Sequence, residues 1–384
     1  MKNTFLLWLF SISILLGQEV NIQYIDSVFQ KAYNEGKFSG HVVIAQENNI
    51  VYDTFFGKAD YEKQLPFDKN SIFQAASISK QFTATAILIL EQQGKLQLED
   101  NVKKHLPEFP YSEVKIIHLL NHTSGMPDFQ KTMIKDLDLS KTNGNQELLQ
   151  LLKSGKYPQR WQAGSKWDYS DIAYCTVALI IERVGQTPFK TFMEQYIFNP
   201  AGMKNTTAEY YTDARLIKNK TICKGYEFDD QTKQQKIAYD QPHNTYVSGL
   251  AGFYGDGSVY TTGYDLLKWD LALHSETILN QKSQEKLFTA TQLNNGNYAE
   301  DLEYKYGLGW YIGKNQNVGT FYFHPGGTSR ILYQIYSLPP NKKPPLRYFQ
   351  TSHILIFIVL PIFIIIFLSK NALLFLFLLH NCTK

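Results

Sequence analysis

A chain of 384 residues is long enough for one large domain or two, with ample material for a hydrophobic core. Its composition, 44% hydrophobic and 19% charged, is that of an ordinary globular protein. The net charge of +3 is too small and too scattered to indicate nucleic acid as a partner. The three cysteines, Cys175, Cys223 and Cys382, lie far apart without metal-ligand spacing. We therefore expect at most one disulfide, no metal and no cofactor.

The chain begins with a short basic start, an apolar run of about a dozen residues and a small residue, Gly17. This pattern predicts a secretory signal over residues 1–17 and hence export, either to the periplasm or out of the cell. A membrane anchor is the alternative interpretation, although the run is short for a span.

Hydrophobic periodicity after the signal predicts a helix that ends at Gly36 and then a hairpin of two strands, 41–45 and 50–55. A strongly apolar helix over 78–90 ends at Gly94. Helix signals then dominate the middle of the chain, at 114–120, 146–152 and 172–184. Strand signals return only after about Gly249, at 306–312, 320–324 and 331–338.

This order predicts an α/β (α+β) fold in which both chain ends build one antiparallel sheet, flanked by helices, around an all-helical insertion. We expect a main domain over 18–340, and its lobes are a sheet lobe at about 20–76 and 249–340 and a helical lobe at about 77–248. Clefts form at seams between lobes, so the seam is the expected place for a site.

Ser77 and Lys80 stand where the first sheet segment gives way to the apolar helix. Residues three apart share a helix face, so the Ser77 hydroxyl and the Lys80 amine can approach hydrogen-bond distance. Burial and the positive end of the helix dipole favour a neutral amine, which can take the serine proton during attack on a carbonyl.

A structural alternative exists for this pair: Ser77 caps the helix and Lys80 extends to the surface. The same spacing occurs twice more in the chain, at Ser112 and Lys115 and at Ser283 and Lys286. Only the apolar helix behind Ser77 separates it from those matches.

Tyr169 lies at the end of a turn-rich loop, 158–171, just before the predicted helix 172–184. A phenol near a lysine ammonium and a helix N-terminus is biased towards phenolate, so Tyr169 could share a proton with Ser77 and deliver it to a leaving group. Taken alone, this tyrosine is more typical of a hydrophobic staple than of a catalytic group.

His324 ends a predicted strand and is followed by a Pro-Gly-Gly sequence, which predicts a tight turn. Glycine lets a backbone amide approach a substrate oxygen closely, so that amide and the amide of Ser77 would form an oxyanion hole. His-Pro-Gly alone is more often a structural turn, but here it comes third, after Ser77 and Tyr169, in the expected order.

The chain resembles the serine β-lactamase-like family in three ordered motifs, Ser77-Ile-Ser-Lys80, Tyr169-Ser-Asp171 and His324-Pro-Gly326. This family includes class C β-lactamases, D-alanyl-D-alanine carboxypeptidases, D-amino-acid amidases and esterases, and the resemblance implies the penicillin-binding-protein fold. Supporting segments also match, at 119–128, 199–203, 255–262 and 306–310. The match covers roughly residues 20–340.

The resemblance implies a role for each matching residue. Ser77 would be the acylated nucleophile, Lys80 its activating partner, and Tyr169 the general base that later protonates the leaving group. His324 stands where lactamases usually carry lysine, which lowers the expectation of efficient antibiotic hydrolysis. Gly327 would supply the second oxyanion amide.

Asp171 departs from the family pattern, which commonly has asparagine at this place. An ionised carboxylate cannot donate a hydrogen bond, so binding of a substrate amide carbonyl by Asp171 is in doubt.

The motifs together predict a cofactor-free serine hydrolase that forms an acyl-enzyme with a small ester, an amide or a D-amino-acid peptide. One alternative is a penicillin-binding-like sensor or scaffold that keeps the fold but turns over little. Another is a true class C-type β-lactamase.

Residues 341–384 form an atypical tail, because 354–368 are apolar apart from Pro361 and a second apolar run covers 372–379. Fifteen helical residues reach about 22 Å, short of the roughly 30 Å hydrocarbon core of a bilayer. A longer span through 379 would enclose Lys370, which is costly.

Three interpretations of this tail stay open. It could hold a membrane segment over 354–379, which would anchor the protein. Alternatively, 354–360 could replace the final sheet strand that relatives carry. A third hypothesis is a shift of reading frame after about Pro339, which mass spectrometry of the natural C-terminus would test.

Overall fold

The computed structural model describes residues 22–36, 38–46, 49–208, 221–229, 232, 234–240, 249–301, 303–315, 319–328, 331–337 and 354–360. Its helices and sheets confirm the predicted α/β (α+β) class. The predicted signal at 1–17 lies outside the described residues, and export therefore stays a prediction.

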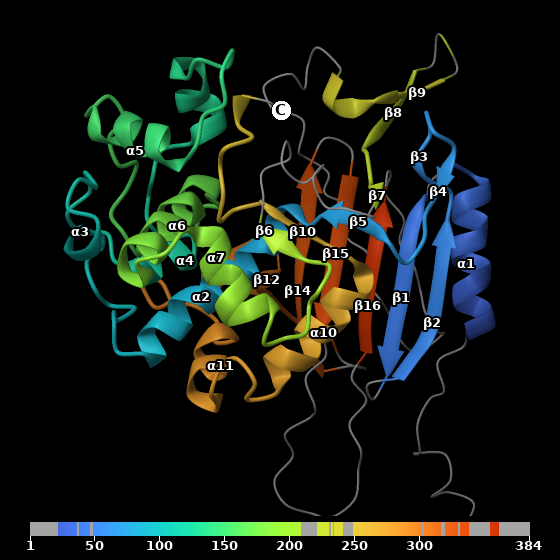
Figure 1. Cartoon of the computed structure of the whole chain (residues 1–384). Coiled ribbons are helices and arrows are strands. Elements are labelled where there is room, and N and C mark those ends of the chain that lie inside the picture. Colours follow the sequence, from blue (N-terminus) through green and yellow to red (C-terminus); the bar gives the residue numbers. More distant parts are fainter. Residues whose placement is uncertain are drawn as a thin grey trace, which may run out of the picture.

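An eight-stranded antiparallel sheet forms the centre of the molecule (Figure 1). Its strands lie in the order β11-β12-β13-β14-β15-β16-β1-β2. Their bounds are Glu300–Asp301 (β11), Tyr304–Tyr306 (β12), Tyr311–Asn315 (β13), Gly319–Thr328 (β14), Ile331–Ser337 (β15), Ile354–Leu360 (β16), Gly40–Gln46 (β1) and Asn49–Phe56 (β2). The first and last described strands therefore share one sheet, as the sequence predicts.

Strand β16 comes from the apolar tail and lies between β15 and β1. It runs antiparallel to both, with Ile358 opposite Gln334 on one side and Val42 on the other. The structure thus selects the interpretation in which 354–360 supply a sheet strand, and these residues do not begin a membrane helix.

No helix in the described part of the chain is long and apolar enough to cross a membrane. The rest of the predicted membrane segment, 361–379, falls outside the described residues. The reading-frame hypothesis stays untested.

Three smaller sheets are also described, with strand orders β6-β10-β5-β7, β3-β4 and β8-β9. Their bounds are Lys58–Asp60 (β3), Leu65–Pro66 (β4), Ser71–Gln74 (β5), Thr207–Ala208 (β6), Thr221–Ile222 (β7), Tyr226–Asp229 (β8), Gln234–Ile237 (β9) and Val259–Thr261 (β10). Strands β6 to β9 lie in the insertion, so the prediction of an all-helical insertion is wrong. Each has only two to four residues, too few for a period-two pattern to appear in the sequence.

The helices gather mainly on one side of the sheet, where α2 to α7 lie together, while α1 packs near β2 at the other side (Figure 1). Their bounds are Ile22–Asn34 (α1), Ser79–Gln92 (α2), Val102–His105 (α3), Ile116–Leu120 (α4), Asn145–Lys153 (α5), Asp171–Gly185 (α6), Phe189–Met193 (α7), Gly263–His274 (α10) and Gln281–Leu287 (α11). Short 3-10 helices are Ala76–Ile78 (η1), Ile134–Asp136 (η3) and Ala238–Asp240 (η5), and short π-helices are Phe129–Met133 (η2) and Glu194–Phe198 (η4).

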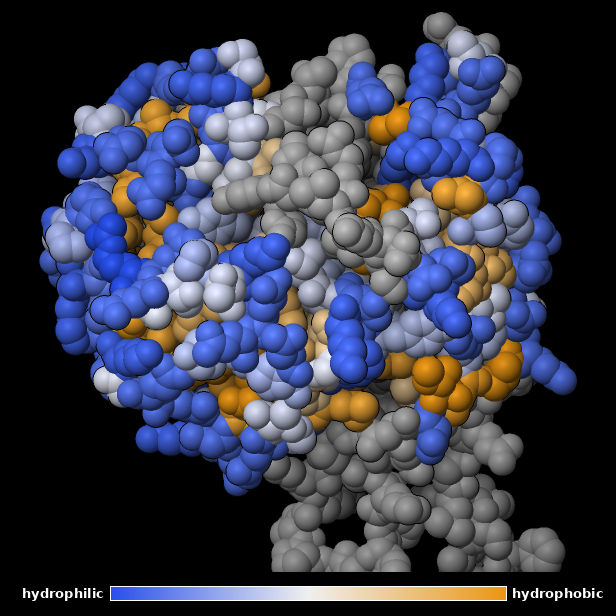
Figure 2. Space-filling view, in the orientation of Figure 1, coloured by the Kyte–Doolittle hydropathy of each residue, from blue (hydrophilic) through white to orange (hydrophobic). Residues whose placement is uncertain are grey.

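Helix α2 is the central element of the core, because it is apolar on nearly every face and must be enclosed. Residues 79–90 of this helix are all buried. The ring of Phe82 packs against Phe198 and Trp269, at centroid distances of 5.5 and 4.4 Å. On the face shown in Figure 2, hydrophilic residues cover most of the described helical surface. The N-terminus of α2 is therefore held in a rigid interior.

Strand β14 continues through His324 and the Pro-Gly-Gly sequence to Thr328, so the predicted tight turn is wrong. Proline usually breaks a sheet because it has no N–H to donate. Beyond Phe323, however, β14 pairs only with β15, since the pairing with β13 ends there. This part of β14 therefore has a free edge, where a missing N–H costs less, and η1 packs against both β14 and β15.

Candidate active site

The turn between β5 and α2 presents Ser77 to the outside of the core. Residues 75–90 are all buried except Ser77, which is partly exposed. Ala76, just before it, has a φ of +46°, a left-handed conformation that is costly for any residue with a Cβ. The strained turn therefore directs one hydroxyl out of an otherwise buried segment.

Strand β14 packs tightly against this turn. A Cβ on Gly326 would overlap the backbone oxygen of Ala75, and it would also crowd the side chain of Ile78. Only glycine lets the strand lie so close to the nucleophile turn. The sequence motif Pro-Gly-Gly thus serves a close approach of two backbones rather than a change of chain direction.

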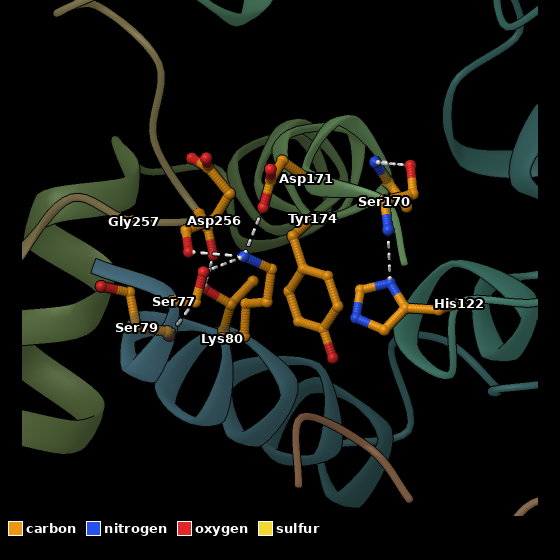
Figure 3. Close-up of polar contacts among 12 residues, drawn as sticks. Ser77, Ser79, Lys80, His122, Ser170, Asp171, Tyr174, Asp256 and Gly257 are labelled. Atoms are coloured by element: carbon orange, nitrogen blue, oxygen red, sulfur yellow. Dashed lines mark hydrogen bonds and ion pairs between the residues drawn. The ribbon is translucent and has the colours of Figure 1, made fainter. Parts of the chain in front are cut away.

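Lys80 is fully buried one turn after Ser77, so the alternative in which it extends to the surface is wrong. Its Nζ donates to the Ser77 Oγ at 3.1 Å, to the Asp171 Oδ1 at 2.7 Å and to the backbone oxygen of Asp256 at 2.9 Å (Figure 3). These bonds use all three donors of an ammonium group.

The charge of Lys80 differs from the sequence prediction. Burial lowers its pKa, but the attraction of the acidic groups around it, first of all the Asp171 carboxylate bonded to Nζ, outweighs burial and raises the pKa above its ordinary value. Lys80 is therefore an ammonium in the resting site, and the predicted neutral amine is wrong. Sequence alone could not place Asp171, 91 residues away, on the lysine.

Tyr169 covers the lysine, with the Lys80 Nζ 4.9 Å from the centre of its ring. Burial raises the pKa of the phenol to about 12, against the lowering effect of the Lys80 charge and with a further raising effect of Asp171. The resting group is thus a phenol, and the predicted bias towards phenolate is wrong. The loop places Tyr169 as expected: helix α6 follows directly, and the Ser170 Oγ caps it by accepting from the Ala173 amide at 3.3 Å.

Two carboxyl groups stand near Lys80. Asp171, the first residue of α6, keeps its side chain 41% exposed while one oxygen binds the ammonium. A negative charge here also suits the positive end of the helix dipole. Burial and the nearby charge of Asp171 raise the pKa of Asp256, although Lys80 lowers it. Asp256 was not among the predicted site residues.

His324 lies next to the site but is buried, with its ring centre 6.2 Å from that of Tyr169. Its Nε2 contacts the Tyr306 hydroxyl at 3.0 Å, and its Nδ1 contacts the backbone oxygen of Pro325 at 2.6 Å. Burial and the positive charge of Lys80 lower its pKa to about 3, so the ring is neutral. Both ring nitrogens already have partners inside the protein.

The oxyanion pocket stays a prediction. Gly327 lies in β14 opposite Leu332, one residue beyond the close approach of Gly326 to the turn. That position is compatible with an amide near Ser77.

Within the described residues, no cluster of three or more histidine, cysteine or acidic side chains could hold a metal ion. Cys175 and Cys223 are buried free thiols.

A sequence model of the family described as beta-lactamase matches residues 25–341. The chain belongs to the beta-lactamase family. This match covers both lobes and the three motifs around Ser77, Tyr169 and His324.

Two similar curated proteins come from bacteria. The chain is 33% identical over 305 residues to penicillin-binding protein 4* of Bacillus subtilis. The aligned part covers 79% of this chain and 66% of that protein. It is 31% identical over 199 residues to esterase EstB of Burkholderia gladioli, covering 47% of this chain and 50% of that protein. The chain thus spans less than two thirds of the length of either relative.

Among solved structures, a penicillin-binding protein from Bacillus halodurans superposes with a TM-score of 0.71. The superposition covers 86% of this chain and 93% of that one, at 23% sequence identity. This similarity shows a shared fold and confirms the architecture that the resemblance implied.

Proposed function

We propose that this protein is a serine hydrolase that cleaves ester or amide bonds through an acyl-enzyme on Ser77. The observation that carries the proposal is the isolated exposure of the Ser77 hydroxyl, with the Lys80 Nζ 3.1 Å away and the Tyr169 ring over that lysine. A nucleophile beside a group that can hold its proton, oriented in turn by a third group, is the general arrangement for acyl transfer.

The protonation of the pair sets the chemistry. With Lys80 charged and Tyr169 a phenol, neither can accept a proton, so the productive form has lost one proton from this pair. The Ser77 proton then moves to the pair while Oγ bonds to the substrate carbonyl carbon. Tyr169 returns a proton to the leaving group as its bond to carbon breaks, and water repeats the sequence in reverse to release the acid.

The charges of the site favour neutral substrates. His324 is neutral, and the one buried ammonium is already paired with Asp171. A substrate carboxylate, such as that of β-lactams, therefore meets no unpaired cation among the described residues that contact Ser77 or Lys80. We expect esters and D-amino-acid amides or peptides to be better substrates than β-lactams, and the similarity to esterase EstB supports this order.

One observation favours a second candidate, a penicillin-binding-like sensor. The Asp171–Lys80 ion pair stabilises the ammonium, which slows every step that needs a free base. A sensor would stay acylated, whereas a hydrolase shows a burst followed by steady turnover. For either function we propose an exported protein, on the predicted signal at 1–17.

The test is labelling by a fluorophosphonate probe, followed by a screen of p-nitrophenyl esters, D-alanyl amides and nitrocefin. We expect Ser77→Ala to abolish labelling. Ser79→Ala is the matched control, because the Ser79 Oγ is buried and accepts from the Val259 amide at 3.0 Å. Labelling that survives Ser77→Ala would disprove the nucleophile, and steady hydrolysis of nitrocefin above the esters would favour a β-lactamase.

A further inference from the structure

Three buried side chains link the loop of Tyr169 to strand β14. His122 follows α4, Tyr306 ends β12 and His324 lies in β14, and all three are almost completely buried. The His122 Nε2 lies 3.2 Å from the Tyr306 hydroxyl, and the same hydroxyl lies 3.0 Å from the His324 Nε2. The hydroxyl of Tyr306 thus joins two histidines from different lobes.

The partners at each end fix the direction of these hydrogen bonds. The backbone amide of Ser170 can only donate, so the His122 Nδ1, at 3.1 Å from it, carries no proton. The backbone oxygen of Pro325 can only accept, so the His324 Nδ1 must carry its proton. With both rings neutral, His122 donates from Nε2 to Tyr306, and Tyr306 donates to the Nε2 of His324.

The surrounding groups agree with neutral rings. Burial, followed by the charge of Lys80, lowers the pKa of His122 well below its ordinary value and lowers that of His324 in the same way. Burial raises the pKa of Tyr306 above its ordinary value. The other titratable groups around the three rings are Tyr169, Tyr174 and Tyr311, whose pKa values burial also raises.

His122 holds Tyr169 from both flanks. The amide of Asp168 donates to the His122 backbone oxygen at 2.9 Å, and the amide of Ser170 donates to the His122 ring (Figure 3). The ring of His122 also lies against that of Tyr169, with centroids 4.3 Å apart. His122 keeps a left-handed φ of +59°, which persists only where the surroundings over-determine the backbone.

We propose that His122, Tyr306 and His324 form a hydrogen-bond chain, in which each group donates to the next, and that this chain holds Tyr169 over Lys80 from strand β14. His324 is then a positioning residue, which acts through Tyr306 and His122 and does not touch the substrate. The proposal rests on the proposed hydrolysis at Ser77, and it adds residues from two lobes that hold the proton donor in place.

Tyr306→Phe tests the chain, because it removes the one hydroxyl on which both histidines depend. Tyr311→Phe is the matched control. Tyr311 is also buried, and its ring lies 4.8 Å from that of Tyr306, but its hydroxyl faces Asp301, which is not part of the hydrogen-bond chain. For p-nitrophenyl butyrate we expect Tyr306→Phe to lower kcat by about 10- to 100-fold with KM changed less than about twofold. Tyr311→Phe should leave both within about twofold of wild type.

The rate of labelling by a fluorophosphonate is measured in parallel. Labelling should slow in Tyr306→Phe and not in Tyr311→Phe, and this comparison needs no ester turnover. If the wild type labels but hydrolyses no substrate, the proposed function fails. The labelling rates of the two variants still test the hydrogen-bond chain. Equal labelling and equal kcat of the two variants would overturn the chain.

His324 offers a second pair of variants in case Tyr306→Phe does not fold. In His324→Gln the side-chain oxygen can accept from Tyr306 at the place of Nε2, whereas His324→Leu cannot accept. We expect His324→Gln to keep kcat within about threefold of wild type and His324→Leu to lose about 10- to 100-fold. Equal losses in both would mean that accepting the hydrogen bond of Tyr306 is not the role of His324, and the proposal would fail.

A pH profile separates positioning from proton transfer by His324. A neutral, internally bonded ring does not titrate between pH 5 and 8, so the profile of kcat/KM for His324→Gln should parallel that of wild type. An acidic limb in the wild type that disappears in His324→Gln would show that His324 exchanges protons during the reaction, which contradicts the chain.

Discussion

The residue that most changes the chemistry of the site is Asp171. Its carboxylate binds the Lys80 Nζ at 2.7 Å, and it is the strongest of the groups that raise the pKa of the lysine. Because the ammonium cannot accept the Ser77 proton, the fraction of productive site grows as pH rises through the pKa of the Lys80–Tyr169 pair. Activity should therefore show an acidic limb that is placed unusually high.

Asp171→Asn should move this limb to lower pH. Removing the carboxylate removes an effect that raises the Lys80 pKa, so the free base appears at lower pH, by roughly one to three pH units for a close charge pair. Activity at pH 7 should accordingly rise, as measured by kcat/KM for an ester between pH 5 and 10. Asp168→Asn is the control, because this carboxylate pairs with Arg160 in the same loop and has no contact with Lys80 in the described structure. A loss of kcat/KM at every pH would instead mean that Asp171 mainly holds the lysine in position.

At the scale of elements, the order of the catalytic segments could be predicted from sequence, and their protonation could not. The apolar helix behind Ser77 and the helix start after Tyr169 depend on local sequence patterns, so the sequence predicts both. The charge on Lys80 depends on the Asp171 carboxylate and on the Asp256 backbone oxygen, which meet its Nζ only in the folded chain. The link between His122 and Tyr306 is likewise non-local, since these residues are 184 positions apart.

The sequence predicts a turn after His324 where the structure has a continuous strand, for a related reason. Proline and glycine together usually mark a turn, but glycine also permits a close backbone approach, and only the packing of β14 on η1 decides between the two. The left-handed φ of His122 marks it as a special position in the structure, but no local sequence pattern predicts that conformation.

Gly326→Ala tests the close approach of these elements. The new Cβ would overlap the Ala75 carbonyl oxygen, so either β14 or the turn before Ser77 must move. A shift of about 1 Å at a nucleophile costs on the order of 100-fold in rate, and we expect kcat/KM to fall by about that factor with the fold retained. Gly257→Ala is the matched control, since a Cβ there would meet Ala76 at 3.8 Å, an ordinary contact distance. Equal activities of the two variants would show that the turn has room to spare.

At the scale of the whole molecule, the sheet depends on a strand from an unusual tail. β16 is the only connection between β15 and β1 in the described sheet, and through it the C-terminal strands join the N-terminal hairpin. It pairs with five residues of β1 and five of β15. Without β16, two central strands would each present an unpaired edge, which invites aggregation.

A chain that stops at residue 353 should therefore be far less stable than one that stops at residue 361, which keeps β16. A backbone hydrogen bond contributes about 1 kcal/mol net, so the lost pairing alone is on the order of several kcal/mol, comparable with the roughly 5–15 kcal/mol that holds a typical domain folded. We expect the shorter chain to aggregate or to melt at a much lower temperature, as measured by thermal unfolding and by the soluble fraction after expression. Because β14 carries His324 and packs on the turn that holds Ser77, fluorophosphonate labelling of Ser77 should also fall in the shorter chain. If both chains melt together and label equally, then β16 is not an integral strand, and the N- and C-terminal parts of the sheet are held together by the helices alone.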